Sequence, residues 1–334
     1  MPFAPGRTND AMPRRSSRTR SHCFCLLLLA ATAVLAGACQ RKGGEALPGA
    51  ATEPATAVSQ LAGYLRNDDL AGYARAAVPP AQYAELEAAW AQGNSRWPLT
   101  ELPLHDKLPA LLATLSDEQA PQQLQRAFKA QIAGQAASVR QAAHSLRLFG
   151  VQYITHQGDY SADERTHYVQ LIKALGNWAQ AAPLSDPDRA ASTIRTLTDA
   201  ARATGLDSDQ ALQQAGMSNS LQRLGPFARA AKQVLAGYGL DLDESAEQLR
   251  VGLLEQQGDH ATVRVQYPLA GEDIDLQVAL ERRQGRWYPA RTLAEVDALL
   301  AAARAAQAPP EPAAEPAVEA GTKAGESPQA AAKP

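Results

Sequence analysis

The sequence has few aromatic side chains, few cysteines and no excess of basic residues. Phe, Trp and Tyr make up 5% of the 334 residues, so the aromatic lining common in ligand pockets is scarce. The formal net charge of −3 offers no basic stripe for phosphates, and we expect no nucleic-acid partner. Glycine-rich phosphate loops and Gly-x-Ser-x-Gly elbows are also missing. We therefore expect no cofactor and no enzyme of a recognised motif class.

Long apolar segments are equally scarce. The longest covers residues 23–38 and has 16 residues, whereas a transmembrane helix needs about 20. Five arginines and one acid precede this run, and Ala36, Gly37 and Ala38 end it. A basic start, a short apolar core and small residues are the parts of a secretory signal peptide. We expect residues 1–38 to be a removable leader, and a translation start at Met12 would make that leader more typical.

The end of the leader resembles the lipobox of bacterial lipoproteins. It reads Leu35-Ala-Gly-Ala-Cys39, with Ala36 where that family prefers leucine. The resemblance implies that Cys39 receives a diacylglycerol, becomes the new amino terminus and attaches the protein to a membrane. Several acyl chains on one cysteine suffice for stable anchoring. Gln40 stands where an aspartate would retain the protein at the inner membrane, which indicates an outer-membrane protein facing the periplasm. A plain signal peptide or an uncleaved anchor is the alternative.

Loss of the leader changes the charge and the cysteine count. It leaves 27 basic and 34 acidic residues, a net charge of −7, and Cys39 as the remaining cysteine. Because the lipid would occupy that thiol, no intramolecular disulfide is expected.

Composition divides the rest of the chain into four parts. Residues 39–57 are rich in Gly, Ala and Pro and predict a flexible tether. Residues 58–240 predict a helical region, and residues 241–305 predict an antiparallel meander with a closing helix. The Ala/Pro/Glu-rich tail, 306–334, has almost no large apolar residue and is expected to be disordered. The fold class is therefore predicted to be α+β.

Local signals mark the helix boundaries in the helical region. Asn67-Asp68-Asp69 and Val78-Pro79-Pro80 separate the first short helices. Ser161-Ala-Asp-Glu164 fits a capping box, and Ser185-Asp-Pro-Asp188 places a cap and a proline at the next start. One long amphipathic helix is predicted from about 119 to 150 by Leu124, Phe128, Ile132, Val139, Leu146 and Phe149.

Residues 249–290 change to a period of two, which is typical of strands. Val263, Val265 and Tyr267 alternate with polar residues, as do the apolar residues from Ile274 to Leu280. Gly258-Asp259 and Gln284-Gly285 supply tight turns. The pattern predicts three or four antiparallel strands, which need a helical cover. A second capping box, Thr292-Leu-Ala-Glu295, is expected to open the closing helix, 292–305.

Two stretches of this pattern resemble the nuclear transport factor two-like (cystatin-like) fold. They are the "GDHATVRV" strand with the later "QGRWY", and the early helix that contains "NDDLAGYA". The resemblance covers about 70 residues, split between the two ends of the body. It implies a curved sheet over helices. Residues 90–240 would then be a large helical insertion. Such an insertion departs from the family pattern, so the cone-shaped cavity usual in that family does not follow from the resemblance.

The best candidate metal cluster consists of His156, Asp159, Asp163, Glu164 and His167. The Glu164-x-x-His167 spacing places two ligands on one helical face. However, the capping box already uses Glu164, and no second such pair occurs. A capped helix start is therefore the preferred interpretation, and no metal site is predicted.

A second acidic group, Asp241, Asp243 and Glu244, resembles a calcium loop only in part. It lacks the glycine and the terminal bidentate glutamate of that pattern. We expect a solvated linker with a helix cap there instead. Trp90, Trp97, Trp178 and Trp287 are expected to be core or interface aromatics.

Three hypotheses about function, from different classes, remain. The first is a lipid-anchored cell-envelope protein with an interaction or structural role and an envelope protein as partner. The alternative is a small-molecule or lipid carrier with a cavity between sheet and helices, which a cavity lined by alternate residues of 249–280 would favour. An enzyme whose site has no recognised motif is a third hypothesis.

Overall fold

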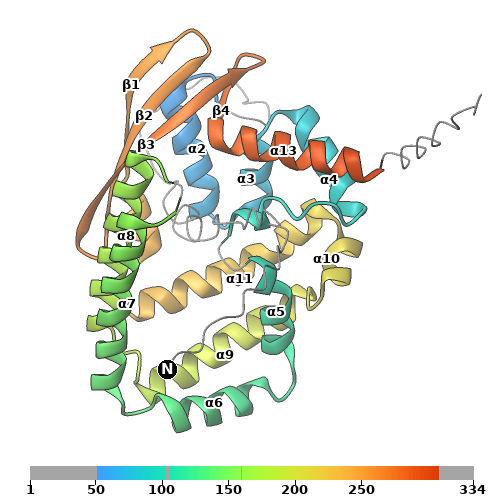
Figure 1. The fold of residues 1–334 in the computed structure, drawn as a ribbon. Coiled ribbons are helices and arrows are strands. Elements are labelled where there is room, and N and C mark those ends of the chain that lie inside the picture. Colours follow the sequence, from blue (N-terminus) through green and yellow to red (C-terminus); the bar gives the residue numbers. More distant parts are fainter. Residues whose placement is uncertain (1–50, 103–104, 159, 308–334) are drawn as a thin grey trace, which may run out of the picture.

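The computed structural model describes residues 51–307, apart from 103–104 and 159. Cys39, the leader and almost all of the predicted tail lie outside the described residues. The described chain has a helical body followed by a four-stranded antiparallel sheet and a closing helix (Figure 1). The α+β prediction is thus confirmed.

The helical body begins earlier than predicted, because Pro54 opens the first helix and residues 54–57 belong to it. None of the described helices combines the length and the apolar character needed to cross a membrane. The α-helices of the body are α2 (Pro54–Arg66), α3 (Leu70–Ala77), α4 (Pro80–Ala91), α5 (Leu108–Ser116), α6 (Ala120–Gln131), α7 (Ala136–His156), α8 (Ala162–Ala181), α9 (Pro187–Thr204), α10 (Asp209–Ala215), α11 (Met217–Gly237) and α12 (Leu242–Glu247). Two 3-10 turns, η1 (Leu99–Glu101) and η2 (His105–Lys107), join α4 to α5.

Several predicted helix starts are confirmed in detail. The Ser161 hydroxyl accepts from the amide of Glu164 at 3.2 Å, and the Ser161 amide donates to Glu164 Oε2 at 2.9 Å. Asp186 caps α9, with Pro187 in its first turn. Each cap accepts hydrogen bonds from backbone amides that have no partner within the helix itself.

The single long helix predicted over 119–150 is wrong. Helix α6 ends at Gln131 and α7 begins at Ala136, with Gly134 between them at a φ of 73°. This left-handed backbone breaks the helical run, and glycine adopts it without strain. Leu146 and Phe149, predicted to be apolar core positions, are 69% and 68% exposed. Helix α7 packs on α8 through a different side, where Gly150 lies against Ile172.

The sheet is a simple meander in the order β1-β2-β3-β4. Glycines with positive φ, among them Gly258 and Gly285, occupy the turns. The predicted alternation is confirmed, because Val263, Val265 and Tyr267 are buried and pair with inward residues of β3. The strands are β1 (Arg250–Gln257), β2 (His260–Leu269), β3 (Glu272–Arg283) and β4 (Arg286–Pro289).

Strand β4 is much shorter than β3 and leaves part of its edge uncovered. It pairs with β3 only from Arg283 to Leu280, where the partner is Pro289. Proline has no amide hydrogen to continue a ladder. Earlier in β3, the amide of Asp275 donates to Gln170 Oε1 of α8 at 2.9 Å. Among the described strands, none covers β3 between these two points.

The closing helix α13 (Ala290–Gln307) follows β4 directly. It begins two residues before the predicted start, so Thr292 lies inside the first turn and the capping box predicted there is wrong. Glu295 instead accepts from Arg291 Nε at 2.8 Å, one turn earlier in the helix.

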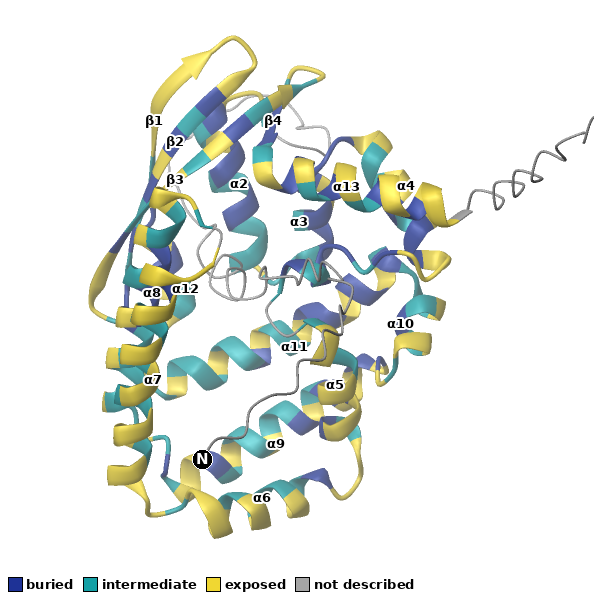
Figure 2. Cartoon of the chain, viewed as in Figure 1, coloured by how far each residue is buried: buried dark blue, intermediate teal, exposed yellow. Residues whose placement is uncertain are grey.

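The buried residues form two main apolar clusters that share α2. One cluster joins the inner face of the sheet with α2 and α8, and the other joins α2, α3, α4, α5, α9, α10, α11 and α13. Val58 belongs to the first and Leu61 to the second. Figure 2 shows the buried residues of α2 between the sheet and the other helices. The two clusters therefore meet at this helix.

Candidate functional site

A cavity of about 410 Å³ lies where the two clusters meet, beside the uncovered edge of β3. Its walls come from α2, α3, η1, α8, β2, β3, the end of β4 and the start of α13. The apolar part of the lining consists of Val58, Leu61, Val265, Leu276, Val278, Ala279 and Pro289. On β3 the lining is the consecutive run from Leu276 to Ala279, so it is not the strictly alternate set that the carrier hypothesis named.

Titratable side chains from distant parts of the sequence line the same cavity. They come from α3, η1, α8 and α13, which the fold brings around one space. These residues are Tyr73, Glu101, Asp163, Glu164, His167, Tyr168, Arg291 and Glu295. An apolar cavity with a few convergent polar groups is the usual form of a ligand site.

Glu101 is a buried carboxylate held by two neutral donors. Trp97 Nε1 donates to its Oε1 at 2.8 Å, and the Tyr73 hydroxyl donates to its Oε2 at 3.2 Å. Burial raises the pKa of Glu101 from 4.5 to about 7, although both hydrogen bonds oppose the rise. Burial, together with the nearby Glu101 charge, also raises the pKa of Tyr73 well above its usual value. Glu101 can therefore gain or lose a proton near neutral pH.

His167 is 4% exposed and lies in the second turn of α8. Neither Nδ1 nor Nε2 has a hydrogen-bond partner among the described residues. Burial lowers the pKa of His167 from 6.5 to about 4, so the imidazole is neutral at pH 7. A neutral imidazole offers one donor and one acceptor. Buried polar groups normally have a hydrogen-bond partner. We therefore expect a bound molecule to supply the partners that the two ring nitrogens lack.

Arg291, at the start of α13, is already neutralised by two carboxylates. It donates to Glu164 Oε1 at 2.6 Å and to Glu295 Oε1 at 2.8 Å. Its contact with the Tyr168 hydroxyl measures 3.3 Å. Although burial opposes its charge, Glu295 and Tyr168 hold the pKa of Arg291 above its usual value. Glu164 therefore has a second role beyond capping α8, since it also fixes this guanidinium.

The structure separates the residues of the candidate metal cluster. Glu164 and His167 line the cavity with Asp163, whereas His156 ends α7 and is exposed. Asp159 lies outside the described residues. Within the described part of the chain, no group of three or more His, Cys, Asp or Glu side chains is arranged to hold a metal ion.

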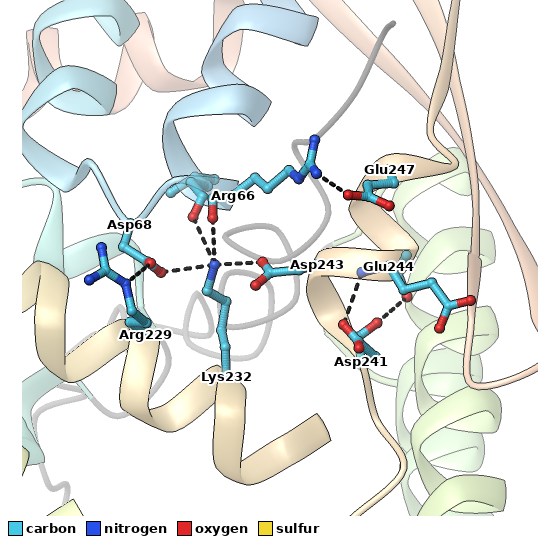
Figure 3. A network of polar contacts seen from close by, with 10 residues as sticks. Arg66, Asp68, Arg229, Lys232, Asp241, Asp243, Glu244 and Glu247 are labelled. Carbon is cyan, nitrogen blue, oxygen red and sulfur yellow. Dashed lines mark hydrogen bonds and ion pairs between the residues drawn. The ribbon is translucent and has the colours of Figure 1, made fainter. Parts of the chain in front are cut away.

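The second acidic group caps a helix, as expected. Asp241 Oδ1 accepts from the amide of Glu244 at 2.9 Å at the start of α12 (Figure 3). Asp243 forms an ion pair with Lys232 of α11. These carboxylates therefore belong to the packing of α12 against its neighbours.

Lys232 is the centre of that polar network (Figure 3). Its Nζ lies 2.8 Å from Asp68 Oδ1 and 2.7 Å from the carbonyl oxygen of Arg66. Arg229 adds a second contact of 2.8 Å to Asp68, and Arg66 pairs with Glu247. Together these contacts join the α2–α3 turn to α11 and α12.

Sequence reasoning missed the cavity residues Tyr73, Glu101 and Arg291. The one signal for Glu101 was an acid between two large apolar residues, Leu99 and Leu102, which is typical of a buried turn. Trp90, Trp97 and Trp287 are buried as expected, and Trp178 is partly buried.

No protein-family model, curated protein or solved structure matches this chain. Function is therefore inferred from the cavity and its side chains.

Proposed function

We propose that this protein is a lipid-anchored cell-envelope protein that binds a small, partly apolar molecule in the cavity, as a carrier and not as an enzyme. Of the functions that the sequence left open, the carrier gains most support from the geometry. The supporting observation is a cavity of about 410 Å³ that contains a buried imidazole with two unsatisfied nitrogens. Ligand pockets usually measure about 300–1,000 Å³.

The cavity suits a molecule with one apolar part and one polar end. Val265, Leu276 and Val278 offer an apolar wall on the sheet side. Glu101 and His167 also line the cavity and offer polar atoms to a ligand that fills it. A bound molecule would thus satisfy His167 and remove apolar surface from water, and both effects favour binding.

Ligand-observed NMR with 1-naphthalenemethanol, a neutral probe of suitable size, tests the binding function. The protein is the chain from residue 39 onward with Cys39→Ala. Saturation transfer to the probe is expected with this protein and is expected to disappear in Val278→Trp, whose larger side chain fills the cavity. Leu253→Trp introduces the same side chain at an exposed position of β1 outside the cavity and serves as the matched control that retains binding. Near-ultraviolet circular dichroism verifies that each variant is folded.

The binding function would be contradicted if the probe bound the wild type and Val278→Trp equally. It would also be contradicted if no transfer were seen with the wild type.

The membrane attachment rests on the lipobox at Cys39 and is tested separately. Radiolabelled palmitate is expected to enter the full-length wild-type protein in cells and to be absent from Cys39→Ala. Label in both proteins would refute the anchor. Fractionation of the envelope is expected to place the lipidated protein in the outer membrane.

A further inference from the structure

The cavity holds more negative than positive groups. Glu101, Asp163, Glu164 and Glu295 line it, with Arg291 as the one guanidinium or ammonium among its described lining residues. Arg291 already binds Glu164 and Glu295. Its close contacts therefore go to these two carboxylates. Glu101 and Asp163 line the cavity without an ion pair in the described chain, although the more distant charge of Arg291 also favours the ionised form of Glu101.

Glu101 is the carboxylate for which this lack has the largest cost. It is 7% exposed, and its two hydrogen bonds come from an indole and a phenol. No ion pair to Glu101 occurs among the described residues. Charges that are removed from water are stable only when they are paired or well hydrogen-bonded. A cation inside the cavity would supply the missing partner.

His167 provides a second, independent indication of what binds. Its neutral ring accepts a hydrogen bond at one nitrogen, and neither ring nitrogen has a hydrogen-bond partner among the described residues. An ammonium group has several N–H donors and can serve a carboxylate and an imidazole together. The apolar wall of Val265, Leu276 and Val278 would hold the uncharged part of such a molecule.

We propose that the ligand of this cavity is an organic cation, an amine on an apolar body whose ammonium group binds the Glu101 carboxylate. The proposal deepens the binding function above and depends on it. A carboxylate or phosphate ligand is disfavoured, because it would enter beside Glu101 and Asp163 and find Arg291 already engaged. A neutral ligand would leave the buried carboxylate unpaired.

Three naphthalene probes of nearly equal size separate these cases: 1-naphthylmethylamine, 1-naphthalenemethanol and 1-naphthoate. Their affinities are compared by NMR titration at about pH 8, where a primary amine remains protonated. The amine is expected to bind at least about tenfold more tightly than the alcohol, and the carboxylate more weakly than either. In Glu101→Gln, the preference for the amine over the alcohol is expected to fall to within about threefold.

Glu255→Gln is the matched control, since Glu255 is an exposed acid on the outer strand β1 and does not line the cavity. It is expected to keep the full preference for the amine. If the alcohol binds and the amine binds no more tightly, or if Glu101→Gln retains the preference, the cation proposal is overturned while the binding function stands. If none of the probes binds, the binding function itself fails.

Discussion

Trp97 and Glu101 are joined inside the fold by a hydrogen bond of 2.8 Å from the indole Nε1 to Oε1. In Trp97→Phe the buried carboxylate would lose this donor, so its charged form would become less favourable. We expect the variant to lose up to about 1.4 kcal/mol more stability at pH 8 than at pH 5, where Glu101 is protonated, because pH 8 is only about one unit above the pKa of Glu101. Urea denaturation at the two pH values measures the difference.

Trp90→Phe is the matched control for this prediction. Trp90 is also buried, but its Nε1 donates to the carbonyl oxygen of Leu212, which does not titrate. Its loss of stability is expected to be the same at both pH values. If the loss of stability in Trp97→Phe were also independent of pH, the indole would not be what stabilises the charged form of Glu101.

Glu101 and His167 should give the protein two opposing pH dependences. The pKa of Glu101 is raised from 4.5 to about 7, so its contribution to stability is present at low pH and is lost as pH rises toward 7. The pKa of His167 is lowered from 6.5 to about 4, so its contribution is present above pH 6.5 and is lost as pH falls toward 4. Between about pH 4.5 and 6.5 the two slopes, each up to about 1.4 kcal/mol per pH unit, oppose each other.

Single substitutions should separate the two pH dependences of the free energy of unfolding. Relative to the wild type, the free energy of unfolding of Glu101→Gln is expected to rise with pH over this range, and that of His167→Asn to fall. Urea denaturation at several pH values gives both differences. Slopes of the same sign in the two variants would contradict the prediction.

Lys232→Met should destabilise the junction of α2, α11 and α12. The Asp68 side chain is 7% exposed and would keep only the Arg229 contact after Lys232 is removed. A loss of about 2–3 kcal/mol is expected, because an incompletely paired carboxylate would remain largely buried. Arg264→Met is the control: it removes an exposed ion pair with Asp275 and is expected to cost less than about 1 kcal/mol. Equal losses in the two variants would argue against the importance of the junction.

Two helical glycines should respond oppositely to alanine. A Cβ at Gly225 would lie 2.6 Å from the carbonyl oxygen of Asp68, so α11 approaches the α2–α3 turn too closely for a side chain. Gly225→Ala is expected to destabilise the protein by about 1–3 kcal/mol. Gly63 has nothing within 4 Å of such an atom, and Gly63→Ala should stabilise α2 by about 0.5–1 kcal/mol. Thermal unfolding measures the stability of both variants. If both were stabilised, the close approach of α11 to the α2–α3 turn would not be the reason for glycine at position 225.

The sequence predicted those features that depend on neighbouring residues. The alternation through Val263, Val265 and Tyr267 indicated the sheet face, and Ser161 with Glu164 indicated a helix start, because both patterns are complete within one element. The predicted continuous helix failed at Gly134, where a left-handed residue divides it. Exposure of Leu146 and Phe149 also escaped prediction, since the packing side of α7 is decided by α8.

The cavity could not be predicted in the same way. Tyr73, Glu101, His167 and Arg291 are far apart in the chain and meet only after the sheet, α8 and α13 have packed. The local spacing of Glu164 and His167 did mark them, but only as candidate metal ligands. In the structure Glu164 binds Arg291, a partner 127 positions away that no local pattern could indicate.

The point at which β4 stops at Pro289 determines how much of the β3 edge is left for the cavity. Each additional residue pair would advance the ladder by about 3.4 Å along that edge and narrow the space from one side. The length of β4 therefore limits the size of the molecule that the cavity can accept. Moving this proline along the hairpin would therefore change which molecules fit beside the β3 edge.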